Sequence, residues 1–147
     1  MARFAVGICA MLALLAPLKI AGSQRETVDA FRAMNFFKTG VSIYTSINDP
    51  AFKCLTTNQT SFDLEAKKAT YIWHFRGYGG TDKQTVTFHV REGKTPDEVT
   101  YVLNNDCMLW VKPDVVHSVP RHCVDNYKQK CPTRYPTYDS DHCNADE

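Results

Sequence analysis

Residues 69–76, ATYIWHFR, decide the fold class because their side chains alternate between two kinds of environment. The three aromatic side chains would share one face of a pleated strand, and mostly polar side chains would occupy the other face. Residues 85–91, TVTFHVR, repeat this alternation, and the glycines and aspartate of residues 77–82 predict a hairpin turn between the two segments. These segments therefore predict neighbouring antiparallel strands in a sheet.

Other segments extend this sheet and add helices around it. From residue 25 to residue 38, apolar residues recur at every third position, which predicts a short helix that ends at Gly40. A second helix is expected to begin at Pro120 and to stop at Pro132, and the tail 132–147 is expected to be irregular. Segments rich in β-branched and aromatic residues predict the remaining strands: 41–47, 53–57, 99–103 and 107–111.

The first 23 residues have the layout of a signal peptide. Arg3 precedes an apolar stretch that is too short to span a bilayer, and small residues follow at 21–23. Removal of residues 1–23 leaves a single domain, residues 24–147, with 15 basic and 16 acidic residues and a formal net charge of −1. We therefore expect a secreted, extracellular protein without a membrane anchor.

Composition argues against several classes of function. A near-neutral charge without a basic stripe argues against nucleic-acid binding, which depends on many phosphate contacts. No pair among the five histidines has the spacing of zinc ligands in suitable company, and no serine or cysteine lies in a recognisable catalytic motif. We expect no metal site, no cofactor and no enzymatic activity.

The five cysteines of residues 24–147 predict a small extracellular domain that is stabilised by disulfides. Their odd number leaves one thiol over, and spacing alone does not fix the pairing. Asn58-Gln59-Thr60 is a glycosylation sequon, so Asn58 is expected to carry a glycan if it lies on the surface.

The C-terminal third of the chain combines a short strand with a cysteine-containing helix and tail: residues 107–111 (CMLWV), Val119-Pro120, Cys123, Tyr138-Asp139 and Cys143. Upstream, Asp29-Ala30-Phe31, Asn48-Asp49-Pro50 and the segment from Cys54 to Val90 extend the pattern. Nearly all of residues 24–147 thereby resembles the tick salivary lipocalins, in particular the histamine-binding-protein-like group. In that family a Cys-Glu-Leu-Trp-Val strand precedes a Val-Pro-x-x-Cys helix and a Tyr-Asp-x-x-x-Cys end. The resemblance implies a mainly β fold, a small antiparallel lipocalin-like β-barrel with an N-terminal and a C-terminal helix.

The same resemblance implies the disulfides Cys54–Cys143 and Cys107–Cys131. It leaves Cys123 unpaired, because the family partner of that cysteine lies on a strand that this chain lacks. Pairing of Cys107 with Cys123, which frees Cys131, is the alternative. We count six strands where a lipocalin has eight, so the barrel is expected to be short or incomplete. A shortened family member, a splice product and an incorrectly assembled gene would each explain this.

Three positions bear on recognition of a cationic ligand. Asp49 and Phe52 match family positions near bound amines, which implies a carboxylate and a ring face for a cation. The alternative is ordinary turn chemistry, in which Asp49 caps its own backbone. Met108 stands where amine-binding relatives carry a glutamate, and a thioether cannot form a charge-assisted hydrogen bond with an ammonium group.

Tyr71, Trp73 and Trp110 are the aromatic candidates for a ligand site. Ligand pockets are mostly apolar, so these side chains would suit the lining of a cavity. In a small barrel the same side chains can instead fill the core.

The function implied by the resemblance is sequestration of a small host mediator, either a biogenic amine such as histamine or serotonin or a lipid. Met108 favours a weak amine binder or an apolar ligand. The alternative is a protein-binding module that blocks a host immune or haemostatic protein through its exterior, a function that needs no cavity.

Overall fold

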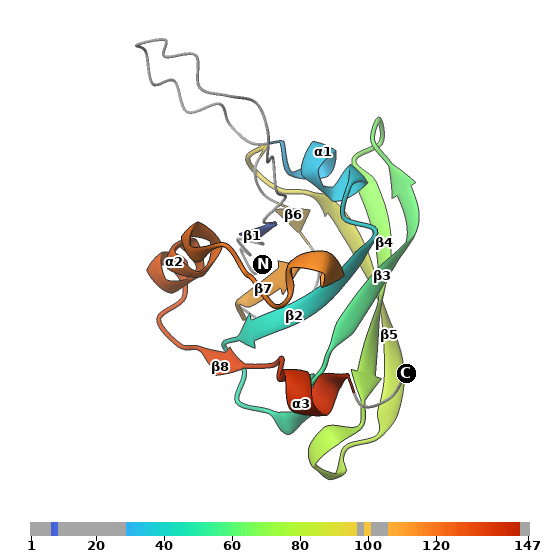
Figure 1. The fold of residues 1–147 in the computed structure, drawn as a ribbon. Helices are drawn as coiled ribbons and strands as arrows, with labels where there is room; N and C mark the ends of the chain where they lie inside the picture. The colour runs from blue at the N-terminus through green and yellow to red at the C-terminus, as the bar shows by residue number, and fades with distance from the viewer. Residues whose placement is uncertain (1–6, 9–28, 97–98, 101–105, 145–147) are drawn as a thin grey trace.

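The computed structural model describes residues 7–8, 29–96, 99–100 and 106–144 and shows a mainly β protein with three short α-helices (Figure 1). The strands are β1 (Gly7–Ile8), β2 (Thr39–Thr45), β3 (Thr56–Asp63), β4 (Lys68–Arg76), β5 (Lys83–Glu92), β6 (Val99–Thr100), β7 (Met108–Val111) and β8 (Tyr135–Pro136). The α-helices are α1 (Ala30–Asn35), α2 (Arg121–Lys130) and α3 (Ser140–Cys143), and the short 3₁₀ turns are η1 (Pro50–Phe52), η2 (Tyr78–Gly80) and η3 (Pro113–Val115).

One sheet joins these strands in the order β1-β7-β2-β3-β4-β5-β6, and β8 pairs with β2. Every pairing is antiparallel except that of β1, which lies within the predicted signal peptide and runs parallel to β7. The two ends of the order are β1 and β6, and closure of the sheet into a barrel is not shown by the described residues. The mainly antiparallel sheet is therefore established, whereas the lipocalin barrel remains a prediction.

The β4–β5 hairpin confirms the alternation seen in the sequence. Its register runs without interruption from Lys68 opposite Arg91 to Arg76 opposite Lys83, and η2 forms the connection. The strand predicted at 53–57 begins later and runs further, because the polar residues of β3 pair with β4 as far as Asp63. Part of the predicted strand 99–103 lies outside the described residues.

Helix α1 begins at Asp29, whose carboxylate accepts a hydrogen bond of 3.0 Å from the Arg32 amide. That bond lowers the pKa of Asp29, and the Lys67 ammonium, 3.0 Å away, lowers it further. The expectation that the helix ends at Gly40 was wrong. The helix ends at Asn35, and Gly40 lies in β2, where a Cβ atom would come within 2.6 Å of the Phe37 ring.

Strand β7 is buried on both faces, which explains its uninterrupted apolar sequence. Met108 and Trp110 face the core that the sheet and α1 share, whereas Leu109 and Val111 face a second core beneath α2. Figure 1 shows α2 on the side of β2 and β7 that faces away from β4 and β5. None of the helices in the described ranges is long and apolar enough to cross a membrane.

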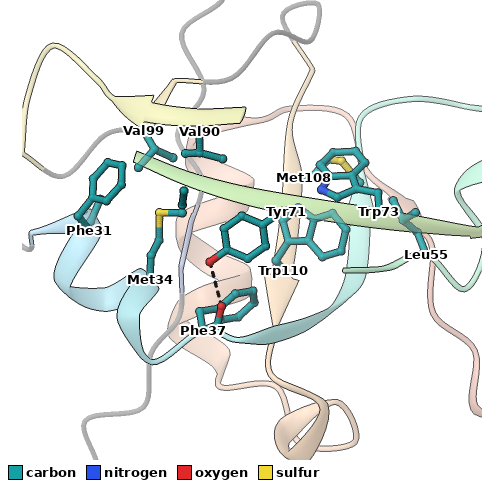
Figure 2. Close-up of a cluster of buried hydrophobic side chains, with 12 residues drawn as sticks. Phe31, Met34, Phe37, Leu55, Tyr71, Trp73, Val90, Val99, Met108 and Trp110 are labelled. Carbon is teal, nitrogen blue, oxygen red and sulfur yellow. Dashed lines mark hydrogen bonds between the residues drawn. The ribbon is translucent and has the colours of Figure 1, made fainter. Parts of the chain in front are cut away.

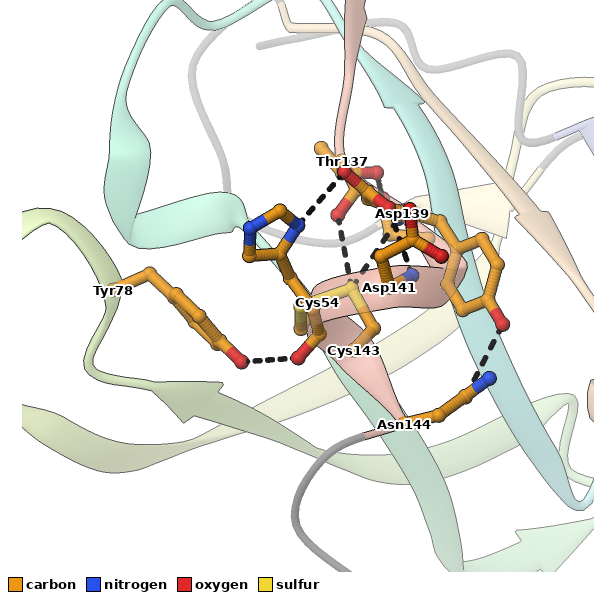
Figure 3. Close-up of a disulfide and its surroundings, with 10 residues drawn as sticks. Cys54, Tyr78, Thr137, Asp139, Asp141, Cys143 and Asn144 are labelled. Atoms are coloured by element: carbon orange, nitrogen blue, oxygen red, sulfur yellow. Dashed lines mark hydrogen bonds and ion pairs between the residues drawn. A yellow bond between two sulfur atoms is a disulfide. The ribbon is translucent and has the colours of Figure 1, made fainter.

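The described part of the C-terminal tail is largely irregular, as expected, with β8 and α3 as its short regular elements, and backbone hydrogen bonds and the Cys54–Cys143 disulfide hold it (Figure 3). Thr137 donates its amide to the Ile43 carbonyl at 2.9 Å, and its buried hydroxyl lies 2.9 Å from that of Ser42. Tyr78 donates its hydroxyl to the His142 carbonyl at 2.6 Å. The tail thus connects β2 to the β4–β5 turn.

Candidate functional site

Strand β4 directs Tyr71, Trp73 and Phe75 to the inner face of the sheet, as the alternation predicted. Tyr71 and Trp73 are 6% and 4% exposed, and Phe75 is half-buried. Trp110 faces the same interior from β7, which β2 and β3 separate from β4 in the sheet. Figure 2 shows Tyr71, Trp73 and Trp110 together with Met108.

Trp73 is the centre of a set of ring contacts that we call the aromatic cluster. Its ring centroid lies 4.9 Å from that of Trp110, 4.2 Å from that of Phe88 and 6.5 Å from that of Phe75. Phe52 extends the cluster, since its ring meets Phe75 edge-on at 5.6 Å. The aromatic cluster therefore spans η1, β4, β5 and β7.

The hydroxyl group of Tyr71 is fully used inside the protein. It donates to the Phe37 carbonyl at 2.9 Å and accepts a hydrogen bond of 2.8 Å from the Gln59 side chain, which also donates to the Met34 carbonyl. Burial raises the pKa of Tyr71 to about 12, so the hydroxyl is neutral at physiological pH. Tyr71 thus holds the end of α1 on the sheet and does not present a free polar group to a ligand.

Among the described residues, the buried side chains of the interior carry no charge that a ligand could meet. Met108 is 3% exposed in the same core as Trp73. The buried polar side chains among the described residues are one serine and three threonines: Ser42, Thr45, Thr57 and Thr137. An ammonium group placed here would lose its hydration without gaining a carboxylate partner.

Asp49 lies outside this interior and acts as a cap. Its carboxylate accepts a hydrogen bond of 2.8 Å from the Ala51 amide at the start of η1, and the side chain is exposed. Phe52, three residues later, packs against Phe75 instead. Asp49 therefore caps a turn, whereas Phe52 packs in the interior, so the two residues have different roles.

Phe88 and Gln59 belong to the site, although the sequence did not single them out. Phe88 stands directly opposite Tyr71 in the register, so the same alternation that marked Tyr71 and Trp73 could have marked it. Gln59 is a polar residue on the inner face of β3, and only the pairing of β3 with β4 reveals its contact with Tyr71.

Asn58 lies on β3 directly opposite Ile72. Its Oδ1 atom accepts a hydrogen bond from His74 Nε2, and a glycan would attach at the other amide atom, Nδ2. Asn58 is half-buried and faces away from the aromatic cluster. Glycosylation at this position remains a prediction.

The cysteines form the disulfides Cys54–Cys143 and Cys107–Cys131, the two pairs that the family resemblance implied. The expectation of an unpaired Cys123 is corrected, because Cys123 is also disulfide-bonded and no described cysteine is free. That expectation rested on the family pairing, in which the partner of Cys123 lies on a strand that this chain lacks, and it counted only the five cysteines of residues 24–147, whereas the full chain contains six.

No group of three or more potential metal ligands occurs within residues 29–96 and 106–144. In comparisons with known proteins, no family model matches the chain and no curated protein matches it. The resemblance to the tick salivary lipocalins therefore stands on the motifs quoted above.

Proposed function

We propose that this protein is a secreted lipocalin-like carrier that sequesters one small apolar mediator, a lipid rather than a biogenic amine. The family resemblance suggests that this mediator belongs to the host of a blood-feeding animal. The site would be the aromatic cluster on the inner face of the sheet.

The observation that carries the proposal is the contact of Trp73 with Trp110 and Phe88 in an interior where none of the described buried side chains is charged. Small-molecule sites are mostly apolar and aromatic, with few polar groups. Rings of this kind offer a ligand large contact areas with little loss of side-chain entropy.

Exposure along β5 indicates where a ligand would enter. Val90, near α1, is buried, Phe88 and Val86 are half-buried, and Gln84 is exposed, although all four face inward. The interior is thus covered by α1 at one end and becomes more accessible toward η2. Phe88 lies at the transition, half-buried against Trp73, where its remaining exposed surface can contact a ligand.

Tryptophan fluorescence tests this proposal directly, because both tryptophans of the chain belong to the aromatic cluster. Titration of the purified protein with a fatty acid or a leukotriene should change the emission of Trp73 and Trp110 and should saturate at one ligand per chain. Histamine, which has an ammonium group and little apolar surface, should leave the emission unchanged.

A pair of matched variants identifies the site. Phe88→Ser should weaken lipid binding at least about tenfold, because it removes a ring that contacts Trp73. Phe36→Ser makes the same chemical change at a side chain that is 67% exposed and should bind as the wild type does. Saturable lipid binding that both variants retain would place the ligand elsewhere and refute this site.

A further inference from the structure

The outer face of the β4–β5 hairpin carries cationic side chains at both ends. We define this outer face by the residues that alternate with the inward-facing ones: Lys68, Thr70, Ile72, His74 and Arg76 on β4, and Lys83, Thr85, Thr87, His89 and Arg91 on β5. No acidic residue is among them. The basic residues are dispersed in the sequence, so the sequence does not reveal the basic stripe that the hairpin creates.

Both ends of the outer face place like charges directly opposite each other. Lys68 pairs with Arg91, and Arg76 pairs with Lys83. Directly opposed side chains in an antiparallel ladder have Cβ atoms about 5 Å apart, and like charges at that distance repel each other. Two such pairs lower the stability of the hairpin in the free protein, and a bound anion would reduce the repulsion between the cations.

Within the described residues, no ion pair joins a carboxylate to any of these four cations. The ion pairs there are Lys67–Asp29 and His142–Asp139, and neither involves the outer face. Asp63 stands opposite Lys68 in the register and offsets part of its charge without forming an ion pair, and its carboxylate accepts a hydrogen bond from the Ala66 amide at 2.8 Å. Lys68, Lys83 and Arg91 are exposed, and Arg76 is half-buried.

The spacing and chemistry of the outer face suit an extended ligand. The nine residues of β4, from Lys68 to Arg76, span about 27 Å along the strand. Between the two cationic ends lie hydroxyl and imidazole groups, with Thr85, Thr87 and His89 exposed. A ligand of matching chemistry would be linear, would carry anionic groups several sugar units apart and would offer hydroxyl groups between them.

We propose that the outer face of the β4–β5 hairpin binds a linear sulfated polysaccharide. Sulfate groups would contact the Lys68–Arg91 and Arg76–Lys83 pairs through charge-assisted hydrogen bonds, and sugar hydroxyls would contact the threonines between them. Ile72 is the only apolar side chain of the face, so the face lacks the aromatic rings on which nucleic-acid bases stack and the apolar anchors that enter a lipid surface.

Asn58 adds a means of control to this site. It lies on β3 directly opposite Ile72 and hydrogen-bonds to His74, so a glycan on its Nδ2 atom would project beside the centre of the outer face. Glycosylated protein should therefore bind the polysaccharide more weakly than protein without the glycan.

The test is retention of the purified, non-glycosylated protein on immobilised heparin, followed by titration with a size-defined heparin oligosaccharide. The wild type should remain bound at physiological salt concentration and should lose affinity as salt rises, because the contacts are ionic. The charge reversal Arg76→Glu with Lys83→Glu should lower the affinity at least about tenfold. Failure of the wild type to bind heparin at physiological salt would overturn the proposal.

Two controls separate the site from a general effect of charge. Lys128→Glu with Lys130→Glu makes the same change in net charge on exposed residues of α2 and should change the affinity less than twofold. An equal loss in this control would refute the outer face as the site. Competition by double-stranded DNA or by phosphatidylserine vesicles as strong as that by heparin would refute a polysaccharide site. Equal binding by the glycosylated wild type and glycosylation-deficient Asn58→Gln would refute the role of the glycan.

Discussion

Tyr71 shows how one side chain can combine an apolar ring with a structural hydroxyl. Its ring faces the interior, and its hydroxyl joins the Phe37 carbonyl at the end of α1 to Gln59 on β3. Loss of the hydroxyl would remove a hydrogen bond from the carbonyl of buried Phe37 and one from half-buried Gln59, and an unsatisfied buried group costs about 1–3 kcal/mol. This residue therefore supports the wall of the candidate site rather than binding the ligand.

Alkaline titration tests the burial of this hydroxyl. The pKa of Tyr71 is raised from 10.0 to about 12 by burial, and burial also raises the pKa of Tyr127 to about 12. Because the pKa is raised in the folded state, its contribution to stability is complete below pH 10 and is lost as the pH rises through 12. Absorbance at 295 nm should show tyrosinate forming near pH 12, and Tyr71→Phe should reduce this late phase. A late phase of unchanged amplitude in the variant would contradict this assignment.

Met108 places an apolar side chain in the interior at the position where a carboxylate could bind a cationic ligand. In Met108→Glu the new carboxyl group would be buried, so its pKa would rise and its charged form would destabilise the fold. We expect the free energy of unfolding to fall by about 2–4 kcal/mol at pH 8 and by less at pH 5, where the carboxyl group is more often protonated. Urea denaturation at the two pH values measures this difference.

Histamine provides the second readout of this substitution. It should raise the melting temperature of Met108→Glu, because its ammonium group can pair with the buried carboxylate, and it should not affect the wild type. Met108→Leu, which keeps the volume, should cost less than about 1.5 kcal/mol and should not respond to histamine. Equal stabilisation of the wild type by histamine would show that the site accepts amines without this carboxylate.

Among the elements, β7 and the C-terminal tail connect the two cores. Strand β7 places Trp110 in the aromatic interior and Leu109 beneath α2, so each change in its position affects both sides of the sheet. The tail fixes β2 and the region before β3 through Thr137 and Cys54. These contacts hold two walls of the candidate site in register.

The two described disulfides should differ in their effect on stability. Cys54–Cys143 closes a separation of 89 residues and Cys107–Cys131 one of 24. Chain entropy predicts a loss of about 4–5 kcal/mol when the longer loop is opened by double substitution to serine, and about 1 kcal/mol less for the shorter loop. Guanidinium denaturation of the two double variants gives the comparison. A larger loss for the Cys107–Cys131 variant would show that packing beneath α2 outweighs chain entropy.

Over the whole molecule, the sequence predicted the elements whose pattern is local. The alternation in β4 and β5 and the prolines around α2 each depend on a few neighbouring residues, and the structure confirms them. The sequence did not predict how far β3 extends. Its residues are mostly polar, and they form a strand because they pair with β4. Gly40 was assigned to a helix end, whereas packing against Phe37 explains its position in β2.

The candidate site was predictable only in part, for the same reason. Tyr71, Trp73 and Trp110 were identified from strand patterns and a motif, and all three are buried in one core. Phe88 and Gln59 complete the surroundings through cross-strand register. The basic outer face depends on register as well, since its opposed cations lie 7 and 23 residues apart in sequence.

Native mass spectrometry of the purified protein, with equal concentrations of a leukotriene, a fatty acid, serotonin and histamine, tests the central claim most directly. If the uncharged aromatic interior is the binding site, one lipid should form a one-to-one adduct that Phe88→Ser weakens and Phe36→Ser does not. Folded protein without any lipid adduct, or with an amine as the preferred ligand, would contradict the account.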